Sequence, residues 1–475
     1  MAVTWPDAIT NTDELSYVAA ATDYAQGRST GVAIDPTTLL PYDRINSLYP
    51  AGTSLAQAPW VAVFGWRGAY VVPLAGFLGA LWAMYALLRS VGLNPWFALV
   101  LPAFPATTVL ARCATSDSWN LFLVTVALAM FAHGVNGPKW RWSLSGFAAG
   151  LVLATREASV LVLAPIMLVA VVRREPGWWA LVAGGALGAG VRLVSAWIIF
   201  DNPLFRHPGY GVFTLHWLLR NFPFYLGITL VLIPAGLVAL VRYRGWRWRE
   251  LTIGAAALLL LHAAYQYGAG ESGGPNAVVI GGRYVMPALP VFALALAWLV
   301  RPQEAGAATG LAGRWQRWRE IVDRRVPAVF TVVALATVAI HPLSWWWSRA
   351  HAGLAADICT HVPPGARAIV SGPTLVKALG PWHCQRAWVP AGQPSAQQAN
   401  KWATESTPLY VVNGVRADSA AYRAGSAAFV QWLDARIAPE RRQVVYRASR
   451  GVVQLEISRI LPPRPSAPPD APRRP

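Results

Sequence analysis

Charged residues are scarce in this chain: they make up 13% of its 475 residues, whereas 55% are hydrophobic. A soluble protein carries about a quarter charged residues, so this scarcity excludes an ordinary soluble globular protein. Three cysteines exclude a disulfide-rich scaffold. The eight histidines show no metal-ligand spacing, and no Walker-type glycine-rich loop is present, which argues against a nucleotide-driven pump. Residues 1–12 also lack the apolar core of a signal peptide.

Long apolar runs dominate what is present, together with 24 tryptophans, a residue enriched at membrane–water interfaces. We predict about ten membrane spans, near residues 68–88, 95–111, 119–133, 143–155, 158–172, 178–200, 222–241, 251–268, 284–300 and 327–346. The net charge of +18 comes mostly from arginines between these runs, where it sets topology. We therefore expect membrane lipids as partners and no nucleic acid.

The distribution of Lys and Arg predicts the orientation. With 143–155 and 158–172 taken as two short helices, alternate loops on one side hold fifteen Lys and Arg and the opposite loops hold five. The basic side is expected to be cytoplasmic, with loops 242–250 and 301–326 among its members. Ten spans then place both ends outside the bacterial cytoplasmic membrane. The first 67 residues have no preceding span to carry them across. Either this segment crosses the membrane by itself or a further span lies upstream of residue 1, and we expect the second.

Four regions follow from this pattern: residues 1–67 as an acidic outer loop with surface helices, 68–346 as a helical membrane domain, 347–460 as a small extracytoplasmic α/β domain, and 461–475 as a disordered Pro-rich tail. In the α/β domain, residues 367–371, 408–413 and 441–457 are predicted strands, and 418–436 has helical spacing. The predicted fold class is an all-α polytopic membrane domain with a C-terminal α/β domain.

The sharpest local motif is TDELSY at 12–17, where Asp13 and Glu14 precede a stretch with helical spacing that carries Tyr17. The plain structural alternative is a helix N-terminus, where acids favour the helix dipole. A Pro/Gly turn at 49–59, starting with Tyr49, leads to the first predicted span. Its structural alternative is a loop at the membrane surface.

The order of these features resembles the GT-C superfamily of membrane glycosyltransferases, and within it the protein O-mannosyltransferases and the bacterial lipid A aminoarabinose transferases. Six segments carry the resemblance: the Asp13-Glu14 pair with Tyr17, the Tyr49-Pro50 turn with Gly52, Ser116-Asp117, 146–156, 200–204 and 281–290. The Trp-Trp-Asp motif of oligosaccharyltransferases is absent, because 345–348 reads WWWS. Transfer of a whole oligosaccharide is therefore not expected.

The resemblance implies inverting transfer of one sugar from a polyprenyl-phosphate donor to an outer-face glycan, lipid or protein. It implies Asp13 as the base, and Glu14 and Asp117 as groups that hold the acceptor or a divalent cation. Such a reaction also needs cationic stabilisation of the departing phosphate. Arg283, beside Gly281, Gly282 and Tyr284, is the expected phosphate ligand, with Tyr17, Tyr49 and Arg156 as further substrate contacts. A divalent cation, Mg or Mn, at Asp13 and Glu14 is a further expectation.

Several alternatives stay open at this point. Arg156 can instead pair with its neighbour Glu157, and charges at span ends are often only interfacial. Cys359 and Cys384 can form a disulfide in an oxidising compartment or stay free thiols. A transporter or flippase of a lipid-linked saccharide is the rival function, although it is expected to carry ionisable groups near the bilayer midplane. A non-catalytic envelope scaffold is a third.

Overall fold

The structure is a computed structural model. It describes residues 9, 12–34, 41–205, 211–233, 236–266, 268, 278–279, 281–301, 311–338, 341–364, 366–371, 387–390, 408–417 and 420–462. The chain divides into two compact units. One, here called the helical unit, consists of Ser16–Thr30 and Ile45–Pro342. The other, the sheet unit, consists of Met1–Leu15, Gly31–Arg44 and Leu343–Pro475.

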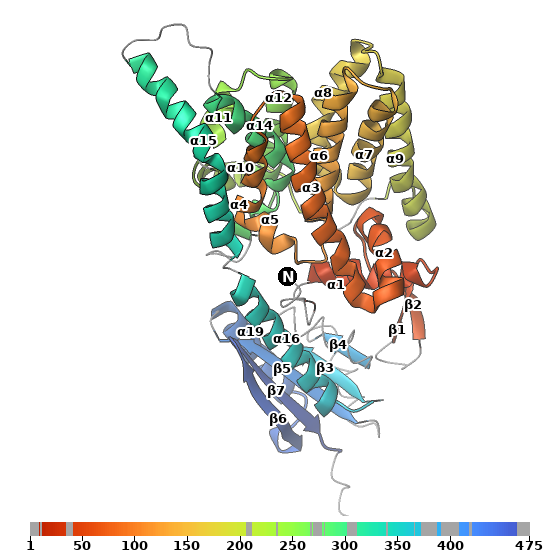
Figure 1. The fold of residues 1–475 in the computed structure, drawn as a ribbon. Coiled ribbons are helices and arrows are strands. Elements are labelled where there is room, and N and C mark those ends of the chain that lie inside the picture. The colour runs from red at the N-terminus through yellow and green to blue at the C-terminus, as the bar shows by residue number, and fades with distance from the viewer. Residues whose placement is uncertain are drawn as a thin grey trace, which may run out of the picture. The chain divides into compact units, whose positions relative to one another are not determined.

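Helices make up nearly all of the regular structure of the helical unit (Figure 1). The first are α1 (Thr12–Ala25, which begins in the sheet unit), α2 (Gly52–Phe64), η2 (Gly65–Tyr70), α3 (Val71–Ser90), η3 (Pro95–Leu99), α4 (Val100–Ala103), α5 (Pro105–Leu110) and α6 (Asp117–Gly134). Next come α7 (Trp140–Thr155), η4 (Glu157–Ser159), α8 (Val160–Val172), α9 (Trp178–Phe200), α10 (Leu215–Gly227) and the π-helical turn η5 (Ile228–Leu232). The last are α11 (Gly236–Arg242), α12 (Trp248–Ala263), η6 (Met286–Ala288), α14 (Leu289–Val300) and α15 (Leu311–Val338).

Small residues let α7 and α9 pack backbone to backbone (Figure 1). Gly146 and Gly150 on α7 face Gly184 and Gly188 on α9, so each helix carries a GxxxG pair. A Cβ atom at Gly184 would lie only 1.9 Å from the carbonyl oxygen of Ser143. Apolar side chains gain little from leaving lipid, so close backbone packing of this kind is a main source of helix association in membranes.

Most predicted spans coincide with helices, but not each with a single helix. Residues 95–111 do not form one helix, because Pro105 forces the residue before it out of the helical region. Phe104 accordingly has an extended backbone, with ψ at 118°, and separates α4 from α5. The loop predicted at 301–326 is helical from Leu311, where α15 starts. Residues 314–326 of that loop contain no Gly or Pro and are rich in good helix formers.

Within the described residues, two helical segments are long and apolar enough to cross a membrane, Gly52–Ser90 and Trp178–Phe200. The pair Leu215–Leu232 and Gly236–Arg242, bent by 90°, would be a third if it forms one span. The helices at the other predicted spans are shorter, interrupted or less apolar. An apolar helical protein that presents such segments is an integral membrane protein, and the count of ten spans remains a prediction.

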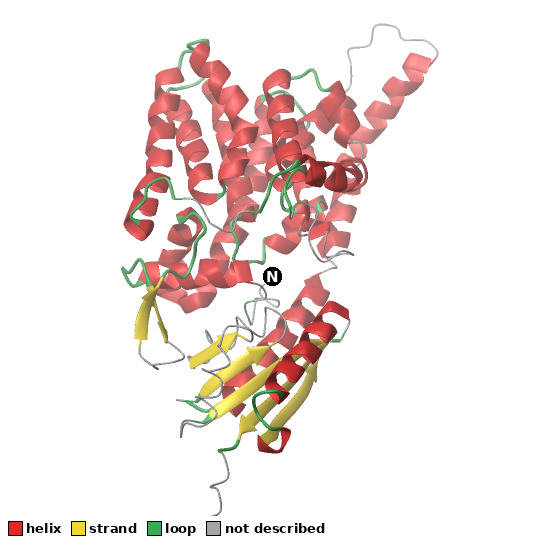
Figure 2. Cartoon of the chain, turned by 180° about the vertical axis from the view of Figure 1, so that it is seen from behind, coloured by secondary structure: helices red, strands yellow, loops and turns green. Residues whose placement is uncertain are grey.

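The sheet unit contains all the longer strands (Figure 2). Its hairpin joins β1 (Gly31–Ile34) to β2 (Pro41–Arg44). Its five-stranded sheet has the order β4-β3-β5-β7-β6 and is built from β3 (Arg367–Ser371), β4 (Ala387–Pro390), β5 (Leu409–Arg416), β6 (Arg442–Arg450) and β7 (Val453–Ile460). The remaining elements are α16 (His341–His361), α19 (Ala420–Asp434) and η7 (Pro439–Arg441).

The sheet is mixed. β3 runs parallel to β4 and β5, whereas β5, β7 and β6 are antiparallel neighbours. One face packs against apolar residues of α16, including Leu354 and Ile358, and the other packs against Phe429 and Leu433 of α19. The predicted strand at 367–371 and helix at 418–436 are therefore confirmed. The run at 441–457 is a hairpin of two strands, and β4 was not predicted.

Candidate active site

A buried ion pair joins the start of α6 to the end of α7. Asp117 opens α6 and is 3% exposed, and its Oδ1 atom accepts from the Arg156 guanidinium. Arg156 leaves the helical conformation just after α7 ends, with ψ at 93°, and this turns its side chain toward α6. The Thr115 hydroxyl donates to Asp117 Oδ2 at 2.9 Å. The carboxylate therefore has a cationic partner and a neutral donor, as a buried charge requires.

Further hydrogen bonds hold this junction. The Thr155 hydroxyl donates to Asn120 Oδ1 at 3.1 Å, and Asn120 Nδ2 donates to the Ser159 hydroxyl at 2.8 Å. All three side chains are buried. The ends of α6 and α7 are thereby tied together on both sides of the break at Arg156.

The pairing between Arg156 and Glu157 that the sequence left open is wrong. Glu157 instead accepts from Arg192 of α9, at 3.0 Å from Nε and 2.8 Å from Nη2. At the break after α7, the side chains of Arg156 and Glu157 point to opposite sides. Arg156 can therefore reach α6, and Glu157 can reach α9. Arg192 went unnoticed in the sequence because it lies inside an apolar run, and a charge within a predicted span is a signal that could have found it.

Tyr17 and Tyr49 lie together, as expected for two members of one site. Their rings stack with centroids 5.1 Å apart and an interplanar angle of 15°. The Tyr17 hydroxyl donates to Ser116 Oγ at 3.1 Å, one residue before Asp117. Ser54 on α2 donates to the Tyr17 carbonyl at 3.0 Å. Residues 99 positions apart are therefore in direct contact.

Tyr284 has two of the arginines predicted to bind substrate over its ring. The Arg156 Cζ atom lies 5.0 Å from the ring centroid and Arg283 Cζ lies 5.2 Å from it. The buried ring of His262 stacks on it at 4.7 Å, and Tyr265 meets it edge-on at 5.9 Å. The electron-rich face of a tyrosine is a favourable place for guanidinium groups. Sequence reasoning missed His262, which lies inside an apolar run.

Asp13 and Glu14 occupy the first turn of α1, as the helix N-terminus interpretation predicts. Asp13 is partly buried, and Glu14 is only 1% exposed. Burial to this degree is unusual for a glutamate. The catalytic roles of both acids remain predictions.

Burial also affects the acid at the other end of α1. Asp23 is 4% exposed, and this desolvation raises the pKa of its carboxyl group. The rise is opposed by a 2.7 Å hydrogen bond from Asn46 Nδ2 and by the charge of Arg28. Asn46 belongs to the segment that leads to Tyr49, so this contact fixes that segment against α1.

The described residues also bear on the divalent cation that was expected. Among the described residues, no three His, Cys, Asp or Glu side chains come together as a metal site. Asp117 already has Arg156 and Thr115 as partners, which leaves it less suited to bind a cation. The described residues therefore do not form a full ligand set for the divalent cation expected at Asp13 and Glu14.

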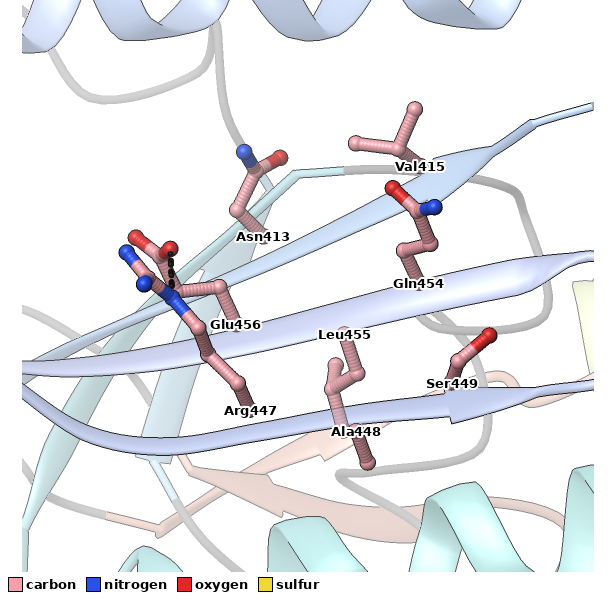
Figure 3. A pocket seen from close by; sticks show the side chains of 8 residues that line it. All are labelled: Asn413, Val415, Arg447, Ala448, Ser449, Gln454, Leu455 and Glu456. Atoms are coloured by element: carbon pink, nitrogen blue, oxygen red, sulfur yellow. Dashed lines mark hydrogen bonds and ion pairs between the residues drawn. The ribbon is translucent and has the colours of Figure 1, made fainter.

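A separate hollow of about 460 Å³ lies on the sheet, on the face that carries α19 (Figure 3). Asn413, Glu456 and Arg447 form one row across β5, β7 and β6, and Gln454 pairs with Ser449 in the next row. Arg447 Nε donates to Glu456 Oε2 at 2.8 Å, with both side chains well exposed. An exposed pair of this kind contributes little stability. None of the residues predicted for the site lines this hollow.

The structure tests one part of the cysteine prediction. Cys359 is disulfide-bonded. Cys384, the partner predicted for Cys359, lies outside the described residues. The pairing of these two therefore stays a prediction.

The chain is an integral membrane protein, and its fold is similar to that of ArnT from Cupriavidus metallidurans, a GT-C lipid A aminoarabinose transferase. One of the ArnT structures that match is a crystal structure with undecaprenyl phosphate bound. That comparison covers 96% of this chain and 95% of ArnT, with a TM-score of 0.59 and 17% identity. The apo structure of the same ArnT gives a TM-score of 0.57 and 18% identity over the same shares. No family model and no curated protein matches the sequence.

Proposed function

We propose that this protein transfers a single sugar from a polyprenyl-phosphate carrier to an acceptor on the outer face of the bacterial cytoplasmic membrane. The observation that carries the proposal is the buried Asp117–Arg156 pair, with Arg156 and Arg283 both over the Tyr284 ring. It supplies a fixed carboxylate beside two cations. That the same fold in ArnT has been seen with undecaprenyl phosphate supports a polyprenyl-phosphate donor.

The reaction is a single displacement. An acceptor hydroxyl attacks the anomeric carbon, and the bond from that carbon to the phosphate oxygen breaks. The departing polyprenyl phosphate keeps the electron pair, and a carboxylate takes the acceptor proton. Attack opposite the leaving group inverts the anomeric configuration.

We assign the roles as follows. Asp13 takes the proton, and Glu14 and Asp117 orient the acceptor. Arg283 and Arg156 stabilise the charge that develops on the phosphate, because guanidinium groups form paired hydrogen bonds to phosphate oxygens. Tyr17, Tyr49 and Tyr284 contact the substrates with their rings. No step is assigned to a divalent cation, and its presence at Asp13 and Glu14 would be tested by activity with and without EDTA.

The proposal includes an orientation. Asp13, Arg283 and the region after residue 347 face outward, whereas 242–250 and 301–326 face the cytoplasm. Single cysteines introduced into each region and labelled with a membrane-impermeant maleimide on intact cells would check this. Labelling of 301–326 from outside would contradict both the orientation and the site.

The deciding experiment is a transfer assay with purified protein in liposomes that contain individual polyprenyl-phosphate sugars. We expect one donor to release polyprenyl phosphate at the rate at which labelled sugar appears on an acceptor. Asp13→Asn protein, purified in the same way, is the matched control. Movement of intact donor between leaflets without phosphate release would favour the flippase instead.

A further inference from the structure

Helix α2 has its polar residues inside and its apolar residues outside. Thr53, Ser54 and Gln57 are at most 1% exposed. The outward positions are apolar: Leu55, Pro59, Trp60, Ala62, Val63 and Phe64. Helices of soluble proteins show the reverse pattern. A helix with an apolar outer face and a polar inner face fits a position between lipid and a polar interior.

The inner face of α2 contacts three segments of the candidate site in the helical unit. Ser54 donates to the carbonyl of Tyr17, as described above. Gly52 packs on the end of α7, where a Cβ atom would lie 2.6 Å from the Ala154 carbonyl oxygen, two residues before Arg156. Gln57 Nε2 donates to the Ala114 carbonyl at 3.2 Å.

The Gln57 contact falls on the turn that carries Asp117. This turn, residues 111–116, links α5 to α6 and contains Thr115, which donates to the Asp117 carboxylate. It also contains Ser116, the acceptor of the Tyr17 hydroxyl. A shift of the Ala114 carbonyl would therefore move the donors around Asp117 together with the start of α6.

Keeping a glutamine at this position has a cost. Gln57 is 0% exposed, and its Oε1 atom has no hydrogen-bond partner among the residues that the structure describes. The same holds for Thr53 Oγ1, one turn earlier on α2. Buried polar atoms without partners destabilise a fold. A methionine of similar volume would avoid this cost at position 57. Buried polar groups that lower the stability of a protein are found where function needs them.

We propose that Gln57 is a positioning residue, which holds the 111–116 turn so that Asp117 and Arg156 keep their geometry during transfer. This inference rests on the proposed function for its kinetic consequence, but its structural part can be measured separately. Gln57 acts through Ala114 and touches no reacting atom. Its loss should therefore lower turnover through Asp117 and Arg156 while leaving the Arg283 contact to the donor phosphate intact.

The test uses the full-length protein in liposomes with three substitutions. Gln57→Met removes the donor at similar volume, and Gln57→Glu keeps the shape but donates only when protonated. Leu55→Ala, on the outward face of α2, is the matched control. We expect Gln57→Met to lower kcat about 10- to 100-fold with the donor KM within about threefold, as for a small misplacement of catalytic groups. Its unfolding temperature should stay within about 3 °C of the wild type.

Two further readouts separate positioning from general damage. Gln57→Glu should recover activity relative to Gln57→Met as the pH is lowered, because the protonated acid can again donate to Ala114. Hydrogen–deuterium exchange should be at least about tenfold faster in residues 111–118 of Gln57→Met and unchanged in α9. Leu55→Ala should match the wild type in both.

Each failure has a distinct meaning. Wild-type kcat in Gln57→Met overturns the inference and leaves the proposed function intact. If the wild-type protein transfers no sugar from any donor, the proposed function fails, and exchange alone then decides. In that case unchanged exchange in 111–118 overturns the inference, and faster exchange confined to that turn supports it.

Discussion

Replacing Arg156 by methionine tests how much the buried Asp117–Arg156 ion pair contributes to the free energy of unfolding. The Asp117 side chain is 2% exposed and that of Arg156 is 15% exposed. Arg156→Met leaves the Asp117 carboxylate buried with the Thr115 hydroxyl as its neutral donor. Removing one partner of a buried pair costs about 3–5 kcal/mol. The unfolding equilibrium constant should therefore rise about 150-fold or more.

The reverse change should cost less. In Asp117→Asn the Arg156 guanidinium loses its carboxylate partner. It still has the Tyr284 ring, whose centroid lies 5.0 Å from Arg156 Cζ, and some access to solvent. We expect a cost of about 1–2 kcal/mol. The double variant has no unpaired charge and should be less destabilised than the sum of the single variants by about 2 kcal/mol.

Unfolding of the four proteins in mixed micelles, followed by tryptophan fluorescence, would measure this cycle. The neighbouring pair Glu157–Arg192 supplies a control, because the Glu157 side chain is 34% exposed. Glu157→Gln should cost about 1 kcal/mol or less. A cost below about 1 kcal/mol for Arg156→Met, or a fully additive cycle, would refute the reasoning that burial makes this pair strong.

Three further outcomes are expected. Asp13→Asn should lower the rate of polyprenyl phosphate release about 10²–10⁴-fold with normal expression, and full activity would show that Asp13 is only a helix-end residue. Arg283→Ala should lower kcat/KM for the donor at least about tenfold through the lost phosphate contact, and an unchanged kcat/KM would contradict that role. Asp23→Asn should gain thermal stability relative to wild type as pH rises from about 4 to 7. A folded-state pKa raised by burial means that the wild type loses stability as Asp23 ionises, so a difference in melting temperature that is constant with pH would count against it.

The sequence by itself determined the helical class, because apolar runs must be helical to satisfy their backbone hydrogen bonds in lipid. It also determined the strand at 367–371, where five consecutive residues are buried between two helical layers. It identified Asp117, Arg156 and Tyr284 as candidates, since charges and aromatic residues at the ends of apolar runs stand out against their surroundings. Its order of motifs pointed to the GT-C superfamily, to which ArnT, a protein of similar fold, belongs.

The tertiary structure alone decided which of these residues pair. Arg156 lies next to Glu157 in the chain but bonds to Asp117, 39 positions away, because the break after α7 turns adjacent side chains to different helices. The inward position of the polar residues of α2 could not be inferred either. The sequence shows that the helix has a polar and an apolar side, but not which side packs against the rest of the protein. Local patterns predict elements, whereas contacts between distant segments depend on packing that no short stretch of sequence contains.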